Sequence, residues 1–571
     1  ALPPGIGRHG REMLPQIQAE CAAYEGVSVI IYDQVCATEK RRRRKRGKMA
    51  VADVTVTINP RVCENCGDCT VQSHCIAIEP IDTEFGRKRR ISPTSCNTDL
   101  SCLKGFCPSF VTSATDAPKR DDSAQWQARE ADLAAGLTEP HLPDLATPWR
   151  GLFAGIGGGG IVTAGAIVAM AASLEGKQVS TLDFTGLAQK NGAVISHVQI
   201  AADGLDVVRI PNGEADLMIA ADLAVGAQKG VLERMRRGGA VIGNMDLQAN
   251  TSFLTNRDLV VDSGLHRRVI DRAVGGNAST YLRATALSEK LFGQAQALNT
   301  LLMGLAWQSG LLPVGQEALL RSIELNGTAV ALNRRAFTWG RILHAHPELA
   351  DAVLAGENLP PATFEALVDT RAAELIRYQS TRLARRYRRL VDAAAAREST
   401  VFGQPGRFAR AVAEGLFRAY AYKDEYEVAR LHAAAEYGDK PVFHMAPPLI
   451  TGTDPATGRR KKIAIPGRVA LPLFRALRHG KALRGTPLDP FGWQAERRAE
   501  RDFARATEAS ITRATNALRP ETLDTAVSLA DIPMHVRGFG PVKEQAMREA
   551  APQREALIAA LSAGPVAIAA E

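Results

Sequence analysis

The chain has 571 residues, of which 46% are hydrophobic and 23% are charged. This length excludes a single core, because domains usually contain about 100–200 residues, and we expect a multidomain protein of α/β and α+β class. The net charge of +9 lies mostly in one run, since eight of the nine residues from 40 to 48 are Lys or Arg. We interpret this run as a solvated linker, with an acidic partner surface or nucleic acid as alternatives. For the chain as a whole we predict no nucleic-acid partner.

Residues 1–50 are predicted to be the C-terminal tail of a larger domain, followed by the basic linker. Met13, Ile17, Cys21 and Tyr24 recur at helical spacing, and residues 27–32 form a β-rich run. One helix and one strand cannot bury their own apolar faces, so the body of this domain is expected elsewhere. The N-terminus lacks the layout of a signal peptide, which favours a cytoplasmic location.

The cysteines are unevenly distributed. Seven of the nine fall between Cys63 and Cys107, and none follows. Such clustering inside a large chain indicates metal binding in a reducing compartment rather than a disulfide framework. We predict that residues 51–112 form a ferredoxin-type iron–sulfur domain, which opens with a strand in which Val54, Val56 and Ile58 alternate.

The cysteine spacing is similar to the bacterial ferredoxin run C-x2-C-x2-C-x3-C-P, in which three cysteines hold one cluster and the fourth reaches the other. Each run has its fourth cysteine displaced, and in the second run Asp99 stands where the middle cysteine belongs. Crossed ligation predicts two [4Fe–4S] clusters, the first on Cys63, Cys66, Cys69 and Cys107, and the second on Cys75, Cys96, Cys102 and either Asp99 or an open position. A carboxylate is a harder donor than a thiolate, so iron bound there should be labile.

Structural zinc is the alternative, with His74 as a further ligand. With zinc on these ligands, the protein would be a zinc-bearing assembly scaffold without enzymatic activity. Three closely spaced thiolates followed by a distant Cys-Pro favour iron–sulfur clusters. Cys21 and Cys36 lie outside the pattern and are predicted to be plain buried thiols.

Residues 113–148 are polar and rich in proline, which predicts a linker. Residues 149–340 are predicted to form a Rossmann-like α/β domain with a parallel sheet, because strands near 152–154, 179–184, 194–200 and 216–225 alternate with helical or loop segments. The uncharged stretch 151–174 is long enough to cross a bilayer. Four consecutive glycines near its start instead favour a strand, a turn and a buried helix, so we predict no membrane partner.

The glycine turn satisfies the dinucleotide fingerprint. Gly155, Gly157 and Gly160 lie between a strand and a helix, and Asp183 follows at about the expected offset of ~20 residues. Taken alone, this pattern favours NAD or FAD; the alternative is that the glycines let the loop approach something else closely, such as a partner domain. Lys190, in the polar loop 185–192, is a candidate for binding phosphate or carboxylate, with a plain surface lysine as the equal alternative.

Residues 341–571 are predicted to form a mostly helical C-terminal domain. Ile376, Leu383, Tyr387 and Leu390 give an apolar stripe to one Arg-rich helix, and a second long helix is expected over residues 496–518. The arginines lack the aromatic platform that single-strand binding requires. We therefore interpret them as a solvated or interface surface.

Seven stretches together carry a resemblance to a known family. They are YDQVCATEKRRRRKRG at 32–47, the cysteine segment 63–110, LDFTGLAQKNGAVISH at 182–197, FTWG at 337–340, YKDEYEVAR at 422–430, TPLDPF at 486–491 and RGFG at 537–540. With them the chain resembles the C-terminal half of the large fused indolepyruvate ferredoxin oxidoreductases, in the 2-oxoacid:ferredoxin oxidoreductase superfamily. Each stretch is weak alone, but the set is specific.

The resemblance implies oxidative decarboxylation of an aryl or branched 2-oxo acid on thiamine diphosphate with Mg²⁺. Coenzyme A would take the acyl group, and [4Fe–4S] clusters would pass the electrons to ferredoxin. Residues 149–340 would be the gamma-type domain, whose glycine loop packs toward the catalytic domains. The alternative enzyme is an NAD(P)H- or flavin-linked iron–sulfur subunit that uses Gly155, Gly157, Gly160 and Asp183.

The chain departs from the family in one respect. We find no Gly-Asp-Gly followed by Asn, the thiamine diphosphate-binding motif, and residues 1–47 resemble only the last αβ unit of the thiamine domain. We therefore expect a missing region or a partner subunit to supply thiamine diphosphate in a homo- or hetero-oligomer. No catalytic residue is assigned within this chain.

Overall fold

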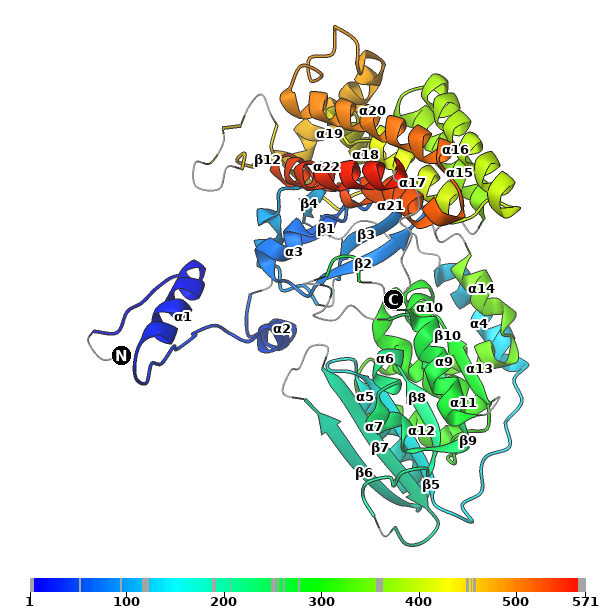
Figure 1. Cartoon of the computed structure of the whole chain (residues 1–571). Coiled ribbons are helices and arrows are strands. Elements are labelled where there is room, and N and C mark those ends of the chain that lie inside the picture. The colour runs from blue at the N-terminus through cyan, green and yellow to red at the C-terminus, as the bar shows by residue number, and fades with distance from the viewer. Residues whose placement is uncertain are drawn as a thin grey trace. The chain divides into compact units, whose positions relative to one another are not determined.

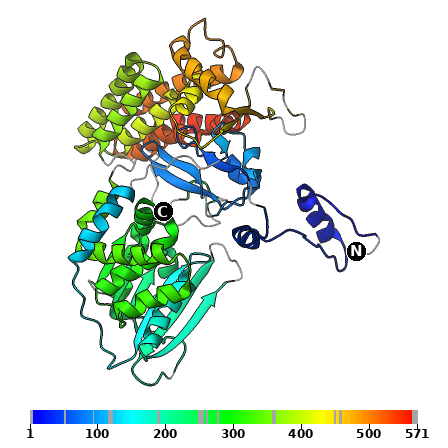
Figure 2. The same cartoon turned by 180° about the vertical axis from the view of Figure 1, so that it is seen from behind.

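A computed structural model describes residues 5–50, 53–92, 95–114, 123–186, 192–205, 207–247, 253, 256–259, 262–275, 278–355, 363–447, 451–452, 454 and 459–562. The chain divides into two units, residues 1–52 and residues 53–571. Both helices and sheets are present, as the predicted mixed α/β class requires (Figures 1 and 2).

The first unit is small and contains η1 (Arg11–Met13), α1 (Leu14–Ala23) and α2 (Ala37–Lys45). Helix α1 confirms the helical spacing of this segment. The predicted strand over residues 27–32 is wrong, because the segment pairs with no strand among the described residues. Its apolar side chains are exposed, with Val27 at 90% and Val29 at 77%. An isolated extended segment has no neighbour to take up its backbone hydrogen bonds, so no ladder forms.

The α/β domain (residues 123–355) is built on a six-stranded sheet of order β10-β9-β8-β5-β7-β6. Its strands are β5 (Trp149–Ile156), β6 (Gln178–Thr185), β7 (Ala193–Ala201), β8 (Ala215–Ala220), β9 (Met235–Asn244) and β10 (Ser279–Leu282). Strands β5, β8, β9 and β10 are parallel, but β7 runs antiparallel to both of its neighbours. The predicted fully parallel sheet is therefore wrong at β7. The connection from β6 to β7 is too short for the crossover that parallel strands need, which is a dozen residues or more.

Helices cover both faces of this sheet. One face packs against α5 (Ile161–Leu174), α11 (Leu298–Gln308), α12 (Gln316–Asn326) and α13 (Val330–Ala345). The other face packs against α6 (Leu223–Gly226), α7 (Lys229–Leu232) and α9 (Ser263–Val274). Strand β5, the glycine turn and α5 confirm the predicted strand, turn and buried helix of residues 151–174. Within the described part of the chain, no helix is both long and apolar enough to cross a bilayer.

The predicted linker contributes to the core of the α/β domain. Its residues 123–135 form α4 (Ser123–Ala135), from which Trp126 packs edge-on against Trp339 at 6.0 Å between ring centroids. Glu130 accepts from the indole nitrogen of Trp339 at 2.9 Å. The same core includes α14 (Glu348–Leu354), which follows the FTWG motif in the chain. It also includes α10 (Ala284–Phe292) and η3 (Ala295–Ala297), which follow strand β10 and precede α11 in the chain.

The cysteine module (residues 53–114) is not a separate folding unit. It contains β1 (Thr55–Ile58), α3 (Asp68–Ser73), β2 (Ile78–Thr83), β3 (Gly86–Ile91), η2 (Ser101–Lys104) and β4 (Phe110–Ser113). Strand β1 confirms the predicted alternation and pairs with β4. On its other side β4 pairs with β11 (Val442–Met445), which pairs with β12 (Ile463–Pro466). One sheet therefore joins the module to the C-terminal part of the chain.

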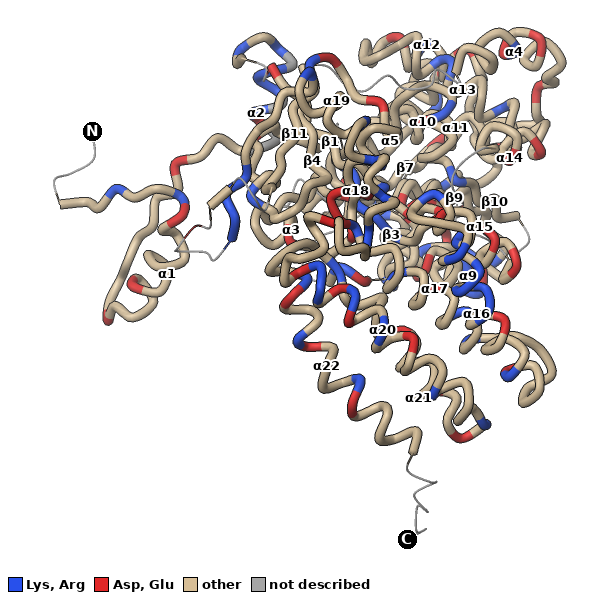
Figure 3. The backbone as a smooth tube through the Cα atoms, turned by 90° about the horizontal axis from the view of Figure 1, so that it is seen from above, with Lys and Arg blue, Asp and Glu red and all other residues tan. Residues whose placement is uncertain are grey.

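The helical domain (residues 363–562) completes the second unit. Its helices are α15 (Phe364–Tyr378), α16 (Thr381–Phe402), α17 (Arg407–Tyr420), α18 (Glu425–Ala433), α19 (Gly467–Leu477), η4 (Arg478–Leu483), α20 (Ala495–Asn516), η5 (Pro520–Thr522), α21 (Leu523–His535) and α22 (Pro541–Ser562). Lys and Arg alternate with Asp and Glu along α20 and α22 (Figure 3). Helix α20 confirms the predicted long helix. The predicted stripe from Ile376 to Leu390 is interrupted, because Ser380 starts a new helix by accepting from the backbone nitrogen of Leu383.

Two glycines allow α11 and α13 to pack closely. A Cβ atom added at Gly304 would collide with the carbonyl oxygen of Phe337, and one added at Gly340 would collide with that of Leu301. Gly340 is the last residue of the FTWG motif. We predict that Gly340→Ala lowers the stability of the α/β domain by about 1–3 kcal/mol, the usual cost of overpacking, as measured by urea unfolding monitored by tryptophan fluorescence.

The control is Gly230→Ala. Gly230 lies in helix α7, and an added Cβ meets nothing within 4 Å. This variant should unfold at the wild-type urea concentration or slightly above it. Equal destabilisation by the two variants would contradict the packing explanation.

Candidate functional site

The two cysteine runs share one backbone conformation. In the first loop Asn65 and Gly67 have φ angles of 52° and 82°, and in the second loop Thr98 and Leu100 have φ angles of 53° and 60°. These are the third and fifth residues of each run, counted from its first cysteine. Positive φ is uncommon for residues other than glycine. Its repetition at equivalent positions indicates that the two loops fold in the same way.

The repetition includes hydrogen bonds to sulfur. The backbone nitrogen of Asn65 donates to Cys63 Sγ at 3.4 Å, and that of Thr98 donates to Cys96 Sγ at 3.3 Å. Hydrogen bonds to cysteine sulfur are among the features by which proteins adjust iron–sulfur clusters. The first thiol of each run is therefore oriented by its own loop.

Asp99 occupies the position of Cys66 in this repeat. The thiol of Cys66 accepts a hydrogen bond from the backbone of Asp68, two residues later. In the second loop Asp99 Oδ1 accepts from the backbone nitrogen of Ser101 at 3.2 Å and from its hydroxyl at 2.9 Å. A carboxylate oxygen thus takes the place of the thiol sulfur, and Asp99 is exposed. The same hydrogen bonds close a turn, so this geometry suits both a ligand and a turn cap.

The thiols of the first group influence one another. Burial, and then Cys107, Cys69 and Cys63, raise the pKa of Cys66 well above its usual value. Burial and the neighbouring Cys63 raise the pKa of Cys107 to about 11. These four cysteines are the set that crossed ligation assigns to the first cluster.

The second group is defined in the same way. Burial, followed by Cys75, Cys96 and Asp99, raises the pKa of Cys102 to about 12. This group contains the remaining cysteines of the module together with the carboxylate of the second loop. Crossed ligation assigns the same residues to the second cluster.

The donor set of both groups fits an iron–sulfur cluster. Thiolates that lie close together in a protein interior repel one another, so they ionise together only beside positive charge. Thiolates are also the ligands that iron–sulfur clusters require. Within the described residues, no three His, Cys, Asp or Glu side chains are placed to hold a single metal ion. The first group is the more enclosed, with Cys63, Cys69 and Cys107 buried, whereas the second has only Cys102 buried.

His74 and two cysteines lie outside these groups. His74, the candidate zinc ligand, is exposed at the end of α3. Cys21 is half-buried and Cys36 is exposed, so the prediction that both are buried is wrong for Cys36. None of the first unit's residues whose burial is described is buried, so no core surrounds these thiols among them.

The glycine turn is occupied by contacts within the chain. Asn299 Nδ2 donates to the carbonyl oxygen of Gly159 at 2.6 Å, and a Cβ added at Gly160 would lie 3.2 Å from the same nitrogen. A Cβ added at Gly155 would lie 2.6 Å from Ile161 Cδ1. Gly155 and Gly160 therefore make close contacts within the chain.

The other members of the fingerprint are not assembled around this turn. Asp183 is exposed on the edge strand β6, and β7 separates it from β5. The backbone nitrogen of Gly157 donates to the carbonyl oxygen of Gly192 at 2.7 Å. Lys190 lies outside the described residues.

Two cations of the helical domain hold the first cysteine loop at Glu64. Arg418 pairs with this buried carboxylate, and Lys423 Nζ lies 2.8 Å from Glu64 Oε1. Burial alone would raise the pKa of Glu64, but the two cations hold it far below its usual value. Lys423 also donates to the carbonyl oxygens of Val62 and Cys63, at 3.2 and 3.3 Å.

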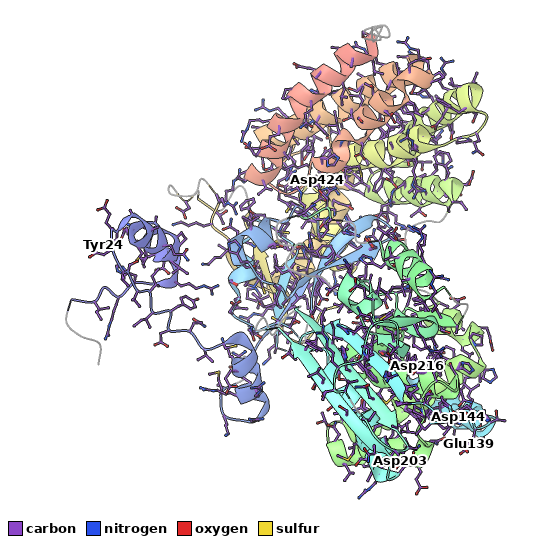
Figure 4. The ribbon with its side chains drawn as sticks, turned by 60° about the horizontal axis from the view of Figure 1, so that its bottom comes forward. Tyr24, Glu139, Asp144, Asp203, Asp216 and Asp424 are labelled. Carbon is purple, nitrogen blue, oxygen red and sulfur yellow. The ribbon has the colours of Figure 1, made fainter. Side chains whose placement is uncertain are left out.

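The sequence offered a signal for these contacts in the motif YKDEYEVAR, although it assigned them no role. Lys423 is its second residue. Asp424, labelled in Figure 4, begins α18 by accepting from the backbone nitrogen of Glu427 at 2.9 Å, and it pairs with Arg484 at 2.7 Å. The motif therefore fixes α18 and holds the cysteine loop at the same time.

His432, in the next turn of α18, connects the helical domain to the end of the cysteine module. Its Nε2 lies 2.9 Å from the carbonyl oxygen of Pro108, and its Nδ1 lies 2.6 Å from the hydroxyl of Tyr437. Tyr437 in turn accepts from Asn59 Nδ2 at 2.8 Å. Burial lowers the pKa of His432 to about 4. The neutral ring therefore donates from Nε2 to Pro108 and accepts at Nδ1 from Tyr437.

Comparisons with known proteins agree with this division of the chain. Residues 150–342 match the family model of pyruvate ferredoxin/flavodoxin oxidoreductase. Residues 364–556 match a family of unknown function, DUF6537. The α/β domain is thus similar to pyruvate ferredoxin/flavodoxin oxidoreductases, and the helical domain is similar to a family without an assigned role.

Curated relatives confirm the more particular resemblance, to the indolepyruvate ferredoxin oxidoreductases. The indolepyruvate oxidoreductase subunit IorB of Archaeoglobus fulgidus is 29% identical over 194 residues, which are 33% of this chain and 90% of that protein. The subunit of the same name from Thermococcus kodakarensis is 23% identical over 192 residues, 33% of this chain and 91% of that protein.

Solved structures to which part of the chain is similar include two subunits. A pyruvate oxidoreductase subunit from Thermotoga maritima is 19% identical, with 34% of this chain and 95% of that chain covered and a TM-score of 0.26. The gamma subunit of a keto/oxoacid ferredoxin oxidoreductase from Geobacter sulfurreducens is 22% identical, with 34% and 98% covered and a TM-score of 0.25.

The neutral state of His432 predicts a pH-dependent stability. Unfolded histidine titrates near pH 6.5, so between about pH 6.5 and pH 4 the unfolded chain binds the extra proton and the folded chain does not. Stability should therefore be complete above this window and fall as the pH decreases through it, by at most about 3 kcal/mol for a pKa of about 4. Urea unfolding at several pH values should show this slope reduced in His432→Gln, and unchanged in His141→Gln, which alters an exposed histidine. An equal slope in wild type and His432→Gln would contradict the assignment.

Proposed function

We propose that the chain is the electron-transfer and gamma-domain portion of an indolepyruvate-type 2-oxoacid:ferredoxin oxidoreductase. In the overall reaction an aryl or branched 2-oxo acid loses CO₂, its acyl group joins coenzyme A, and two electrons pass to ferredoxin. The domain match and the curated relatives support the enzyme class. The observation that carries the electron-transfer role is the repeated loop, which gathers seven thiols and one carboxylate into two groups.

The cysteine module is assigned two [4Fe–4S] clusters. Once bound, such clusters accept and release single electrons. The first is assigned to Cys63, Cys66, Cys69 and Cys107, and the second to Cys75, Cys96, Cys102 and Asp99. The module's own contribution is to orient the sulfurs with backbone N–H groups and to keep the first group away from water.

Thiamine diphosphate and Mg²⁺ are assigned to a partner region or subunit, in a homo- or hetero-oligomer. The relatives are named as subunits, which supports this arrangement. Coenzyme A is assigned as the co-substrate and ferredoxin as the electron acceptor. A cytoplasmic location suits the seven clustered thiols, which need a reducing compartment.

Two other functions differ from this one in their bound groups. An NAD(P)H- or flavin-linked subunit requires a nucleotide at the glycine turn, where the Asn299 side chain lies. A zinc-bearing scaffold requires zinc on the thiols, and zinc–thiolate sites are colourless. A brown protein with broad visible absorption supports the clusters, a yellow flavin spectrum supports the second function, and a colourless zinc protein supports the third.

The ligand assignment predicts that the second cluster is the labile one. Anaerobically prepared protein should contain about eight irons and lose about one on mild oxidation, with a [3Fe–4S] signal in electron paramagnetic resonance. Asp99→Cys should supply a fourth thiolate and suppress this loss. Asp99→Asn is the matched control, because its amide oxygen can still close the turn but lacks the ionic charge, so iron loss should become easier.

A turn cap without a metal role gives a different pattern. In that case Asp99→Asn retains the wild-type iron content and stability to oxidation. Four irons per chain, unchanged in Asp99→Cys, would remove the support for a second cluster.

The partner assignment predicts the activity of the isolated chain. Purified alone, with thiamine diphosphate, Mg²⁺ and coenzyme A added, it should not release CO₂ from indolepyruvate or from branched 2-oxo acids. Adding a thiamine-binding subunit of an indolepyruvate oxidoreductase should restore release, measured as labelled CO₂ together with reduction of ferredoxin. Turnover by the chain alone would overturn this assignment.

A further inference from the structure

We propose that the helical domain has a redox role: it places the cation of Lys462 between the two thiol groups, where it raises the reduction potentials of both clusters. This inference rests on the proposed function, because it concerns the clusters assigned there. It gives the family of unknown function that spans residues 364–556 a specific task in this chain.

Lys462 contacts the segment that connects the two groups. Its Nζ donates to the carbonyl oxygens of Leu103 and Gly105, at 3.0 and 2.8 Å. Both residues lie between Cys102, which belongs to the second group, and Cys107, which belongs to the first. The ammonium group is therefore next to the short stretch of chain that both groups share.

The charge of Lys462 acts on thiols of both groups. Burial lowers the pKa of Lys462, and Cys107 and Cys69 from the first group and Cys102 from the second oppose this by favouring its charged form. The ammonium also lies 5.4 Å from the centre of the Phe110 ring. Lys462 is half-buried, so its charge is less screened than that of an exposed lysine.

The sheet fixes the position of this lysine. Lys462 directly precedes β12, in which Ile463 pairs with Met445 of β11. Strand β11 pairs with β4 of the cysteine module through Phe443 and Val111. A ladder of backbone hydrogen bonds therefore holds the ammonium against the module, which a lysine at the end of a free loop would not achieve.

Other parts of the helical domain close over the first group. Arg459 pairs with Asp68 at 2.8 Å, and Asp68 accepts from the backbone nitrogen of Phe106 at 2.6 Å. In the RGFG motif, a Cβ added at Gly538 would lie 3.4 Å from Cys66 Cβ, and one added at Gly540 would lie 2.5 Å from the Phe106 ring. Glycine at these two positions lets the backbone approach the cysteine loop closely.

A cation placed in this way favours the reduced clusters. Reduction adds one negative charge to a group that already carries several thiolates, and a nearby buried positive charge stabilises the added charge. Burial, hydrogen bonding and net charge are the features by which proteins set such potentials. Lys462 also ties two carbonyl groups together, so a purely structural role is the alternative that an experiment must separate.

The test compares three variants of the full chain. Lys462→Met removes the charge and keeps most of the side-chain volume, whereas Lys462→Arg keeps the charge. Lys461→Met is the matched control, because Lys461 is the preceding residue and is exposed. Iron and sulfide content is measured first, and then the midpoint potential of each cluster is measured by redox titration monitored by electron paramagnetic resonance.

Lys462→Met should retain its iron, and both of its midpoint potentials should fall. The ratio of reduced to oxidised cluster at the wild-type midpoint should decrease by about three- to tenfold, and tenfold corresponds to about 59 mV for one electron. Lys462→Arg and Lys461→Met should remain close to wild type. If Lys462→Met does not assemble its clusters, Lys462→Gln, which keeps a neutral donor, replaces it with the same expectation.

Unchanged potentials in an iron-replete Lys462→Met protein would overturn the inference, as would an equal shift in Lys461→Met or in Lys462→Arg. Failure of the cluster assignment itself is distinguishable, because the wild-type protein would then lack iron and sulfide altogether.

Discussion

The pairing of β4 with β11 is the contact on which the arrangement of the second unit depends. Strand β4 follows directly after Cys107-Pro108, and β11 comes from the helical domain, far later in the sequence. Because their backbone groups share one ladder, removing the helical domain would leave one edge of β4 unpaired. An exposed edge invites association with other chains. The module and the helical domain are therefore best regarded as one folding unit, despite their separation along the chain.

Charge balance follows from this shared sheet. The helical domain supplies cations to the module from several elements, namely Arg418 and Lys423 beside Glu64, Arg459 beside Asp68, and Lys462 at the segment between the thiol groups. The α/β domain contributes as well, since Arg257 donates to the carbonyl oxygen of Cys66 at 2.7 Å. Burying thiolates without compensating charge is costly. The basic side chains that surround the module reduce this cost whichever metal the thiols bind.

Local patterns allowed much of this fold to be predicted from the sequence. The strand–glycine–helix unit at residues 149–174, the alternation in β1 and the length of α20 are set by residues close together in the chain. The antiparallel β7 was missed because its direction depends on the length of one connection, which hydrophobic alternation does not reveal. The role of α4 was missed because the segment is polar and contains prolines, which indicates a linker. Its one buried tryptophan, Trp126, packs against Trp339, which lies far away in the sequence. The strand expected at residues 27–32 needs a neighbour that no local pattern can guarantee.

The candidate site likewise has some features that the sequence predicts and others that it does not. The cysteine spacing alone assigned the cysteines to two sets, because two loops of the same conformation place their corresponding side chains in corresponding positions. Spacing could not reveal that the two sets differ in access to solvent, since the covering residues Lys423, His432 and Gly538 come from another part of the chain. The two loops share one backbone conformation but are covered by different residues, so the two thiol groups lie in chemically different environments. The first group is enclosed and surrounded by cations, whereas the second leaves Asp99 at the surface. On the proposed ligand assignment, solvent access and the harder donor Asp99 would both act on the second group, so any difference in lability between the two clusters should favour loss of iron from the second.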